Sequence, residues 1–177
     1  MKNLRPFIDR PILSAAPDYY HYFFQLTNED SFLETALQNQ LSNFELFINS
    51  IPSEKENYSY AEGKWSIKGV VAHCVETERI PQYRALRFSR FDSTEISGFD
   101  ENWYTKHNNH EALSLSDLME EFTCVRKATL LLYQNMTLQM LDFVGIANQK
   151  PNTARNIGWF IVGHLIHHTQ VIKQRYL

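Results

Sequence analysis

Hydrophobic residues recur along the chain with the period of an α-helix, and no segment shows a convincing β-strand alternation. A first apolar stripe, at positions 33, 37, 41, 44 and 48, predicts a helix over about residues 30–50 that ends near Pro52. A second helix is predicted from Ser66, a good N-cap residue, to about Phe91, with Pro81 inside it. The pattern favours an all-α fold.

The second half of the chain carries two more helical patterns. One begins near Ser114, where Ser-Leu-Ser-Asp resembles a capping box, and ends before Gly145. The other begins at Thr153, after Pro151, and continues through Gln174. Four amphipathic helices of comparable length in one chain predict a four-helix bundle.

The remaining segments are expected to surround this bundle. Residues 6–28 are rich in Pro, Tyr and Phe and are interpreted as an arm that wraps around it, while the Asn-containing segment 98–110 is interpreted as a loop. A length of 177 residues is typical of one domain. We therefore expect a single domain over 1–177, with an N-terminal arm (1–29) and a helical bundle (30–177).

Composition and charge exclude several classes of protein. The net charge of −3 gives no reason to expect binding to nucleic acid, and no apolar stretch is long enough to indicate a membrane span. Phosphate-binding glycine motifs are also lacking from the sequence. The two cysteines, Cys74 and Cys124, lie in apolar helical patterns and are interpreted as reduced core residues, which favours a cytoplasmic location.

Two histidines occupy positions of the last helix where apolar side chains are expected. His164 and His168 share a helical face with Ile157, Ile161 and Val171. Burying two imidazoles one turn apart is costly unless each is hydrogen-bonded or ligated, and at i and i+4 their ring nitrogens can converge on one point. This pair is the first indication of a metal site.

A third inward histidine comes from the second predicted helix. His73 shares a face with Val70 and Thr77, so His73, His164 and His168 can meet in the bundle interior. Three neutral histidines leave a tetrahedral Zn²⁺ with one open position, as in catalytic zinc sites, while Ni²⁺ or Fe²⁺ would also accept imidazole ligands. The competing interpretation is that these histidines are hydrogen-bonded core residues or hold a structural ion.

Charged and aromatic residues near the second helix extend this picture. Arg126, on the third helix, is expected to point inward and to pair with Glu76 or Glu78. The aromatic residues Tyr60, Trp65, Trp103 and Tyr104 could line the mouth of a pocket, although packing roles are the commoner use of such side chains.

The element Gly63-Lys64-Trp65-Ser66-Ile67 leads to His73, and a closing element runs from Gly163-His164 to His167-His168. Taken in this order, these motifs resemble the DinB/YfiT-like family of metalloenzymes. The resemblance implies a four-helix bundle, commonly a homodimer, in which His73, His164 and His168 hold the metal. Relatives often carry Asp three residues after the first histidine, where this chain has Glu76. That longer carboxylate could reach the metal or orient one of its ligands.

The resemblance also suggests a reaction. Characterised relatives include thiol S-transferases that use low-molecular-weight thiols, usually with zinc, so transfer of a small thiol to an electrophilic small-molecule substrate is the leading hypothesis. In a hydrolase, metal-activated water would attack instead, with Glu76 or Glu78 as a candidate base. A non-catalytic, dimeric binding module is the remaining alternative.

Overall fold

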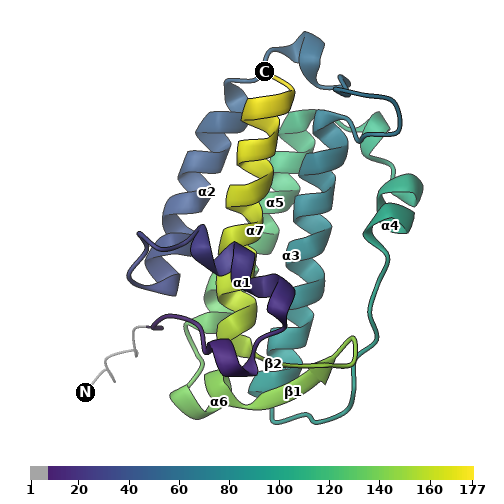
Figure 1. Ribbon diagram of the computed structural model, residues 1–177. Coiled ribbons are helices and arrows are strands. Elements are labelled where there is room, and N and C mark those ends of the chain that lie inside the picture. The colour runs from purple at the N-terminus through teal and green to yellow at the C-terminus, as the bar shows by residue number, and fades with distance from the viewer. Residues whose placement is uncertain (1–7) are drawn as a thin grey trace.

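The computed structural model describes residues 8–177, and its four longest helices form a four-helix bundle (Figure 1). The bundle helices are α2 (Leu33–Asn49), α3 (Ile67–Ser89), α5 (Leu115–Tyr133) and α7 (Ala154–Arg175). All four lie where the apolar stripes predict them, so the expected all-α bundle is confirmed in its main elements.

The starts of three bundle helices are fixed by side-chain caps that the sequence predicts. The side chain of Ser66 accepts a hydrogen bond from the Gly69 backbone N–H, and that of Thr153 accepts one from Asn156. At α5, Ser114 and Asp117 form a reciprocal capping box. Each cap satisfies a backbone donor that the first helical turn would otherwise leave unpaired.

Helix α7 lies at the centre of the molecule and is almost entirely buried over its first half. Every residue from 154 to 165 is buried, including Trp159, the largest of the fully buried side chains. A helix that is covered on all sides needs neighbours on all sides, and α1, α2 and α3 each pack against α7. The second half of α7 leaves one side partly open.

The structure corrects the expectation that the chain contains no strand. Residues Val144–Ala147 (β1) and Lys150–Thr153 (β2) form an antiparallel hairpin, whose turn is made by Asn148 and Gln149 at positive φ. Both strands are too short for alternation to show in the sequence.

The third predicted helix also ends earlier than expected, at Tyr133, and is followed by the short helix α6 (Leu138–Asp142).

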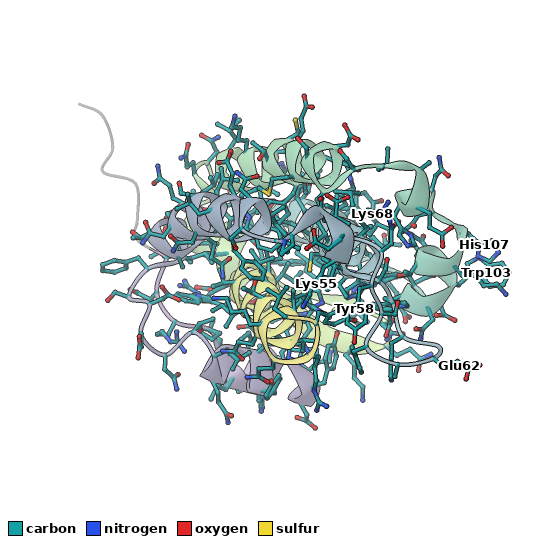
Figure 2. All side chains as sticks on the ribbon, turned by 90° about the horizontal axis from the view of Figure 1, so that it is seen from above. Lys55, Tyr58, Glu62, Lys68, Trp103 and His107 are labelled. Carbon is teal, nitrogen blue, oxygen red and sulfur yellow. The ribbon has the colours of Figure 1, made fainter. Side chains whose placement is uncertain are left out.

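The expected loop at 98–110 contains a short helix, which is a second correction. Helix α4 (Glu101–His107) begins after Asp100, whose carboxylate accepts hydrogen bonds from the Asn102 and Trp103 backbones. Figure 2 shows Trp103 and His107 on the outer edge of α4, away from the bundle. The cap makes this turn helical although its apolar pattern is weak.

The N-terminal segment contains one helix that rests on the bundle. Helix α1 (Asp18–Gln25) crosses α7 (Figure 1), and its Phe23 carbonyl approaches so closely that a Cβ at Gly163 would lie 2.2 Å from the carbonyl oxygen. Glycine is therefore required at this crossing. Of the expected arm, residues 1–7 lie outside the described part of the chain.

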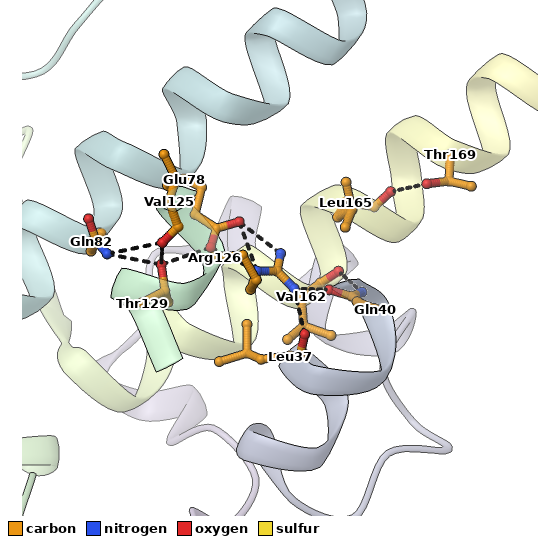
Figure 3. A network of polar contacts seen from close by, with 10 residues as sticks. All are labelled: Leu37, Gln40, Glu78, Gln82, Val125, Arg126, Thr129, Val162, Leu165 and Thr169. Atoms are coloured by element: carbon orange, nitrogen blue, oxygen red, sulfur yellow. Dashed lines mark hydrogen bonds and ion pairs between the residues drawn. The ribbon is translucent and has the colours of Figure 1, made fainter. Parts of the chain in front are cut away.

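A buried polar network joins α2, α3 and α5 (Figure 3). Arg126 donates from Nε and Nη2 to the Glu78 carboxylate at 2.8–3.1 Å, and from Nη1 to Leu37 O and to Gln40 Oε1, both at 3.0 Å. Thr129 Oγ1 donates to Glu78 at 2.8 Å. The expected pairing of Arg126 with a carboxylate is confirmed, and its partner is Glu78.

Two further features of the chain concern membranes and thiols. Within residues 8–177, no helix combines the length and the apolar character that a membrane crossing requires.

Both cysteines are free, and Cys74 is buried as expected. Cys124 is exposed, which corrects its assignment to the core, because it lies on the outer face of α5.

Candidate metal centre

Three histidines from two helices meet beside the bundle axis. The Nε2 atom of His164 lies 3.1 Å from Nε2 of His73 and 3.1 Å from Nε2 of His168. One ring nitrogen from each histidine can be chosen so that all three lie within 4.8 Å of one another. His73 and His164 are buried and His168 is half-buried.

The helical framework explains why these side chains converge. His164 and His168 are one turn apart on α7, and His73 faces them from α3, which packs along α7. Positions that the apolar pattern assigns to the core therefore place three imidazoles in contact. The structure brings together the three residues that the sequence singles out.

Burial keeps these imidazoles neutral. Desolvation is the largest cause of the lowered pKa of each ring, and the neighbouring histidines lower it further. The pKa falls to about 4 for His73 and to about 3 for His168, and that of His164 lies well below its usual value. Neutral imidazole is the form that ligates a metal ion.

The donor set fits a divalent cation. Tetrahedral ligands at Zn–N distances of about 2.0–2.1 Å would place their nitrogens about 3.3 Å apart, and two of the nitrogen pairs here are 3.1 Å apart. Thr77 Oγ1 lies beside the His73 ring, 3.4 Å from Nδ1 and 3.5 Å from Nε2. No Asp, Glu or Cys joins the three histidines within the part of the chain that the structure describes. Such a set would leave coordination positions open.

The three histidines line a cavity of about 450 Å³, within the range of small-molecule sites. Its walls come from α1, α3, α7, the segments that precede α3 and α4, the start of α4 and the hairpin turn, and they include six Tyr, Phe and Trp side chains. The lining residues are Tyr19, Tyr20, Phe23, Trp65, His73, Thr77, Pro81, Arg84, Gly98, Phe99, Glu101, Asn148, Phe160, His164, His167 and His168.

The two candidate acids of α3 point away from this cavity. Glu76 accepts a hydrogen bond from Asn108 Nδ2 at 3.2 Å and lines a separate, smaller cavity. Glu78 is held by Arg126 and Thr129. The structure therefore brings neither carboxylate to the histidine cluster, and Arg126 serves the network rather than the cavity.

Of the aromatic residues expected at a pocket mouth, only Trp65 lines the cavity. Its ring lies 4.7 Å from that of His73. Tyr60 instead packs against Tyr176, and Trp103 against His107. Tyr104 lies against Phe99, which does line the cavity.

Sequence reasoning missed most of the cavity wall. Tyr19 and Phe23 come from α1, and Arg84 continues the face of α3 that carries His73, Thr77 and Pro81. The spacing of that face, four, four and three residues, was a usable signal for Arg84. Nothing in the sequence shows that α1 crosses α7 at this point.

The fold and the cluster together define a class of protein: a four-helix bundle in which histidines from two helices converge beside an internal cavity. More specifically, the chain belongs to the DinB superfamily, whose model matches residues 36–172. No curated protein matches the chain.

A solved structure confirms the architecture. YfiT from Bacillus subtilis, described as a probable metal-dependent hydrolase with an unusual four-helix bundle topology, superposes with a TM-score of 0.70. The match covers 93% of this chain and 89% of YfiT at 16% sequence identity. At that identity the likeness establishes a shared fold.

Proposed function

We propose that this protein is a divalent-metal-dependent hydrolase that acts on a small molecule. The observation that carries the proposal is the convergence of three neutral histidine side chains at the wall of a cavity of small-molecule size. His73, His164 and His168 would hold the cation. Zn²⁺ is the proposed metal because it commonly takes three histidines in catalytic sites, with Ni²⁺ and Fe²⁺ as alternatives.

A cation bound there would supply Lewis acidity, which acidifies water and polarises a carbonyl. The chain itself supplies position and environment. Thr77 contacts the His73 ring, and Phe23, Trp65 and Phe160 give the cavity apolar walls beside the cluster. His167 lines the same cavity, with its Nδ1 3.1 Å from the Tyr22 hydroxyl.

Hydrolysis is favoured over the thiol transfer that the sequence motifs suggest. The description of YfiT as a probable metal-dependent hydrolase supports hydrolysis, because the two proteins share their fold over most of both chains. No observation in the described residues favours a thiol cosubstrate. Thiol transfer therefore enters as an outcome of the test.

A catalytic role is also favoured over a structural ion. Structural zinc sites are closed by four protein ligands, whereas this cluster offers three and borders a cavity. The homodimeric state that the family resemblance implies and the cytoplasmic location that the two cysteines favour remain part of the proposal. Light scattering coupled to gel filtration would test the first, and cell fractionation the second.

The proposal is tested by measuring metal content and activity on the same preparations. Protein purified without a histidine tag is analysed for metals, freed of metal with a chelator and titrated with Zn²⁺ and Ni²⁺. The compared variants are His73→Ala/His164→Ala/His168→Ala and, as a matched control, His107→Ala, which changes an exposed histidine on α4. Ester and amide substrates are then assayed with and without a low-molecular-weight thiol.

We expect one tightly bound cation per chain in the wild type and in His107→Ala, and none in the triple variant. Turnover should require the cation and proceed without thiol. Turnover only with thiol would replace hydrolysis by thiol transfer. A wild type that binds no divalent cation would overturn the metal-dependent function and return the histidines to a packing role.

A further inference from the structure

Arg84 is a buried cation in the wall of the cavity. Its relative exposure is 5%, and it lies on α3 among the cavity-lining residues. Nη2 donates to the Ser97 carbonyl at 3.1 Å, whereas Nε is buried and has no hydrogen-bond partner. Among residues 8–177, no carboxylate forms an ion pair with this guanidinium.

An uncompensated buried charge is costly, so its environment matters. The Phe99 ring lies 5.9 Å from Arg84 Cζ, and one carbonyl accepts from one of the five N–H donors. The neighbouring phenols add no negative charge, because burial raises the pKa of both Tyr19 and Tyr20. In contrast, Arg126 and Arg155, the other buried arginines among residues 8–177, are paired with Glu78 and Asp142. Arg84 therefore lacks the anion that such a group normally has.

Arg84 and the histidine cluster lie along the same cavity, so an anion bound to Arg84 would lie on the side of the cavity that leads to the cluster. His73, Thr77, Pro81 and Arg84 follow one face of α3, and all four line the same cavity. Eleven residues of helix separate the Cα atoms of His73 and Arg84 by about 16 Å. Helical side chains lean toward the N-terminus, which brings the guanidinium back toward the cluster. A ligand between them would have two distinct ends.

We propose that Arg84 binds the carboxylate of the substrate while the reacting bond lies at the histidine cluster. The assignment of the reacting end rests on the proposed function, whereas the anion site rests on Arg84 itself. Arg84 is the only Arg or Lys among the lining residues, which matches a single negative charge better than a phosphate dianion. The aromatic walls suit an apolar or aromatic body between the two ends. The substrate class is therefore small aromatic or apolar carboxylates.

Glu101 is the one carboxylate among the lining residues. It is the alternative partner for Arg84, in place of a substrate carboxylate. It is exposed, lies in the first turn of α4 and forms no ion pair with Arg84 in the structure. If Glu101 moved to neutralise Arg84, its removal would strengthen the binding of an external anion. Glu101→Gln therefore belongs in the experiment.

The test measures the affinity of the full chain for phenylacetate and for its neutral analogue phenylacetamide by calorimetry or NMR titration. It uses metal-free protein, because a bound cation would itself attract a carboxylate. The variant is Arg84→Gln, and the matched control is Arg79→Gln, which removes an exposed arginine of the same helix. Arg84→Lys keeps the charge if the glutamine variant does not fold. Zn²⁺ titration of each preparation tests the metal site separately.

We expect wild type, Arg79→Gln and Glu101→Gln to prefer phenylacetate at least tenfold, and Arg84→Gln to lose that preference. Equal affinity for the two probes in wild type, or a preference that survives in Arg84→Gln, overturns the anion site. If only Glu101→Gln prefers phenylacetate over phenylacetamide by more than tenfold, Glu101 is the partner of Arg84, and this result also overturns the anion site. Zinc binding without this preference leaves the proposed function standing, whereas the preference without zinc binding leaves only the anion site.

Discussion

Arg126 and Glu78 form an ion pair from which solvent is excluded, with side-chain exposures of 0% and 2%. The guanidinium donates to the carboxylate through Nε and Nη2, and its Nη1 makes two more hydrogen bonds to α2, so one residue ties three bundle helices together. Such a pair is costly to break on one side only, because the remaining charge stays buried.

Replacing Arg126 with Met should therefore lower the free energy of unfolding by about 3–5 kcal/mol. The double variant Glu78→Leu/Arg126→Met should recover much of this loss, since no charge is left unpaired. Urea denaturation gives both values. Arg79→Met, which breaks the exposed pair with Glu121, is the control and should cost less than about 1 kcal/mol. Equal losses in the single and double variants would show that the network matters for reasons other than charge.

Zinc should stabilise the folded protein, because the three imidazoles converge only in the folded state. At a free concentration 100 times the dissociation constant, the gain is about 2.7 kcal/mol. Thermal unfolding with and without Zn²⁺ measures it. His73→Ala should abolish most of the stabilisation, while His107→Ala should retain it. A rise in melting temperature that is the same in both variants would place the bound zinc elsewhere.

The metal-free protein should lose stability as the pH falls below about 6.5. The unfolded chain takes up protons on His73, His164 and His168 near that pH, whereas the folded pKa values are lower, at about 4 for His73 and about 3 for His168. The unfolded state then binds more protons, and each imidazole costs up to about 1.4 kcal/mol per pH unit within this window.

The check is the free energy of unfolding between pH 7.5 and about 5, above the range where carboxylates titrate. The triple alanine variant should show a much flatter profile than wild type. Parallel profiles would mean that the folded protein already takes up these protons, for example by opening the cluster to water.

Gly163→Ala should destabilise the protein by about 1–3 kcal/mol through overpacking. Its Cβ would meet the backbone of Phe23, so α1 must shift, and Phe23 is part of the cavity wall. Gln170→Ala, at an exposed position of the same helix, should change stability by less than about 0.5 kcal/mol. Chemical denaturation measures the loss of stability, and tryptophan fluorescence reports the shift of α1. A Gly163→Ala protein with the stability of the wild type would show that α1 is loosely attached.

The bundle could be predicted from sequence because its helices follow a strong apolar period and begin at recognisable caps. Ser66, Ser114 and Thr153 are examples in which a local hydrogen bond fixes a boundary that the sequence displays. The histidine cluster was predictable for the same reason, since the period assigns His73, His164 and His168 to inward faces. The expectation for Arg126 held because a buried guanidinium needs a carboxylate.

The features that the sequence did not predict depend mainly on contacts between segments that are distant in sequence. The hairpin depends on Asn148 and Gln149 at positive φ. It also depends on Ile96, whose N–H donates to the Ile146 carbonyl and whose carbonyl accepts from the Asn148 N–H. None of these features produces a periodic pattern. Helix α4 depends on one cap at Asp100. The family resemblance left open whether Glu76 reaches the metal, and the structure turns its carboxylate toward Asn108 instead.

The crossing of α1 over α7 has an evolutionary consequence. The family model matches residues 36–172, which include all three histidines of the cluster and Arg84, whereas Tyr19, Tyr20 and Phe23 precede the matched region. Under the proposed function, the metal-ligating histidines and one of the aromatic walls are thus encoded in separate stretches of the gene, whereas Trp65, Phe99 and Phe160 belong to the matched region. Replacement or drift of the leading stretch would remodel one wall while leaving the imidazoles in register, so a lineage could acquire new substrates without rebuilding the centre that acts on them.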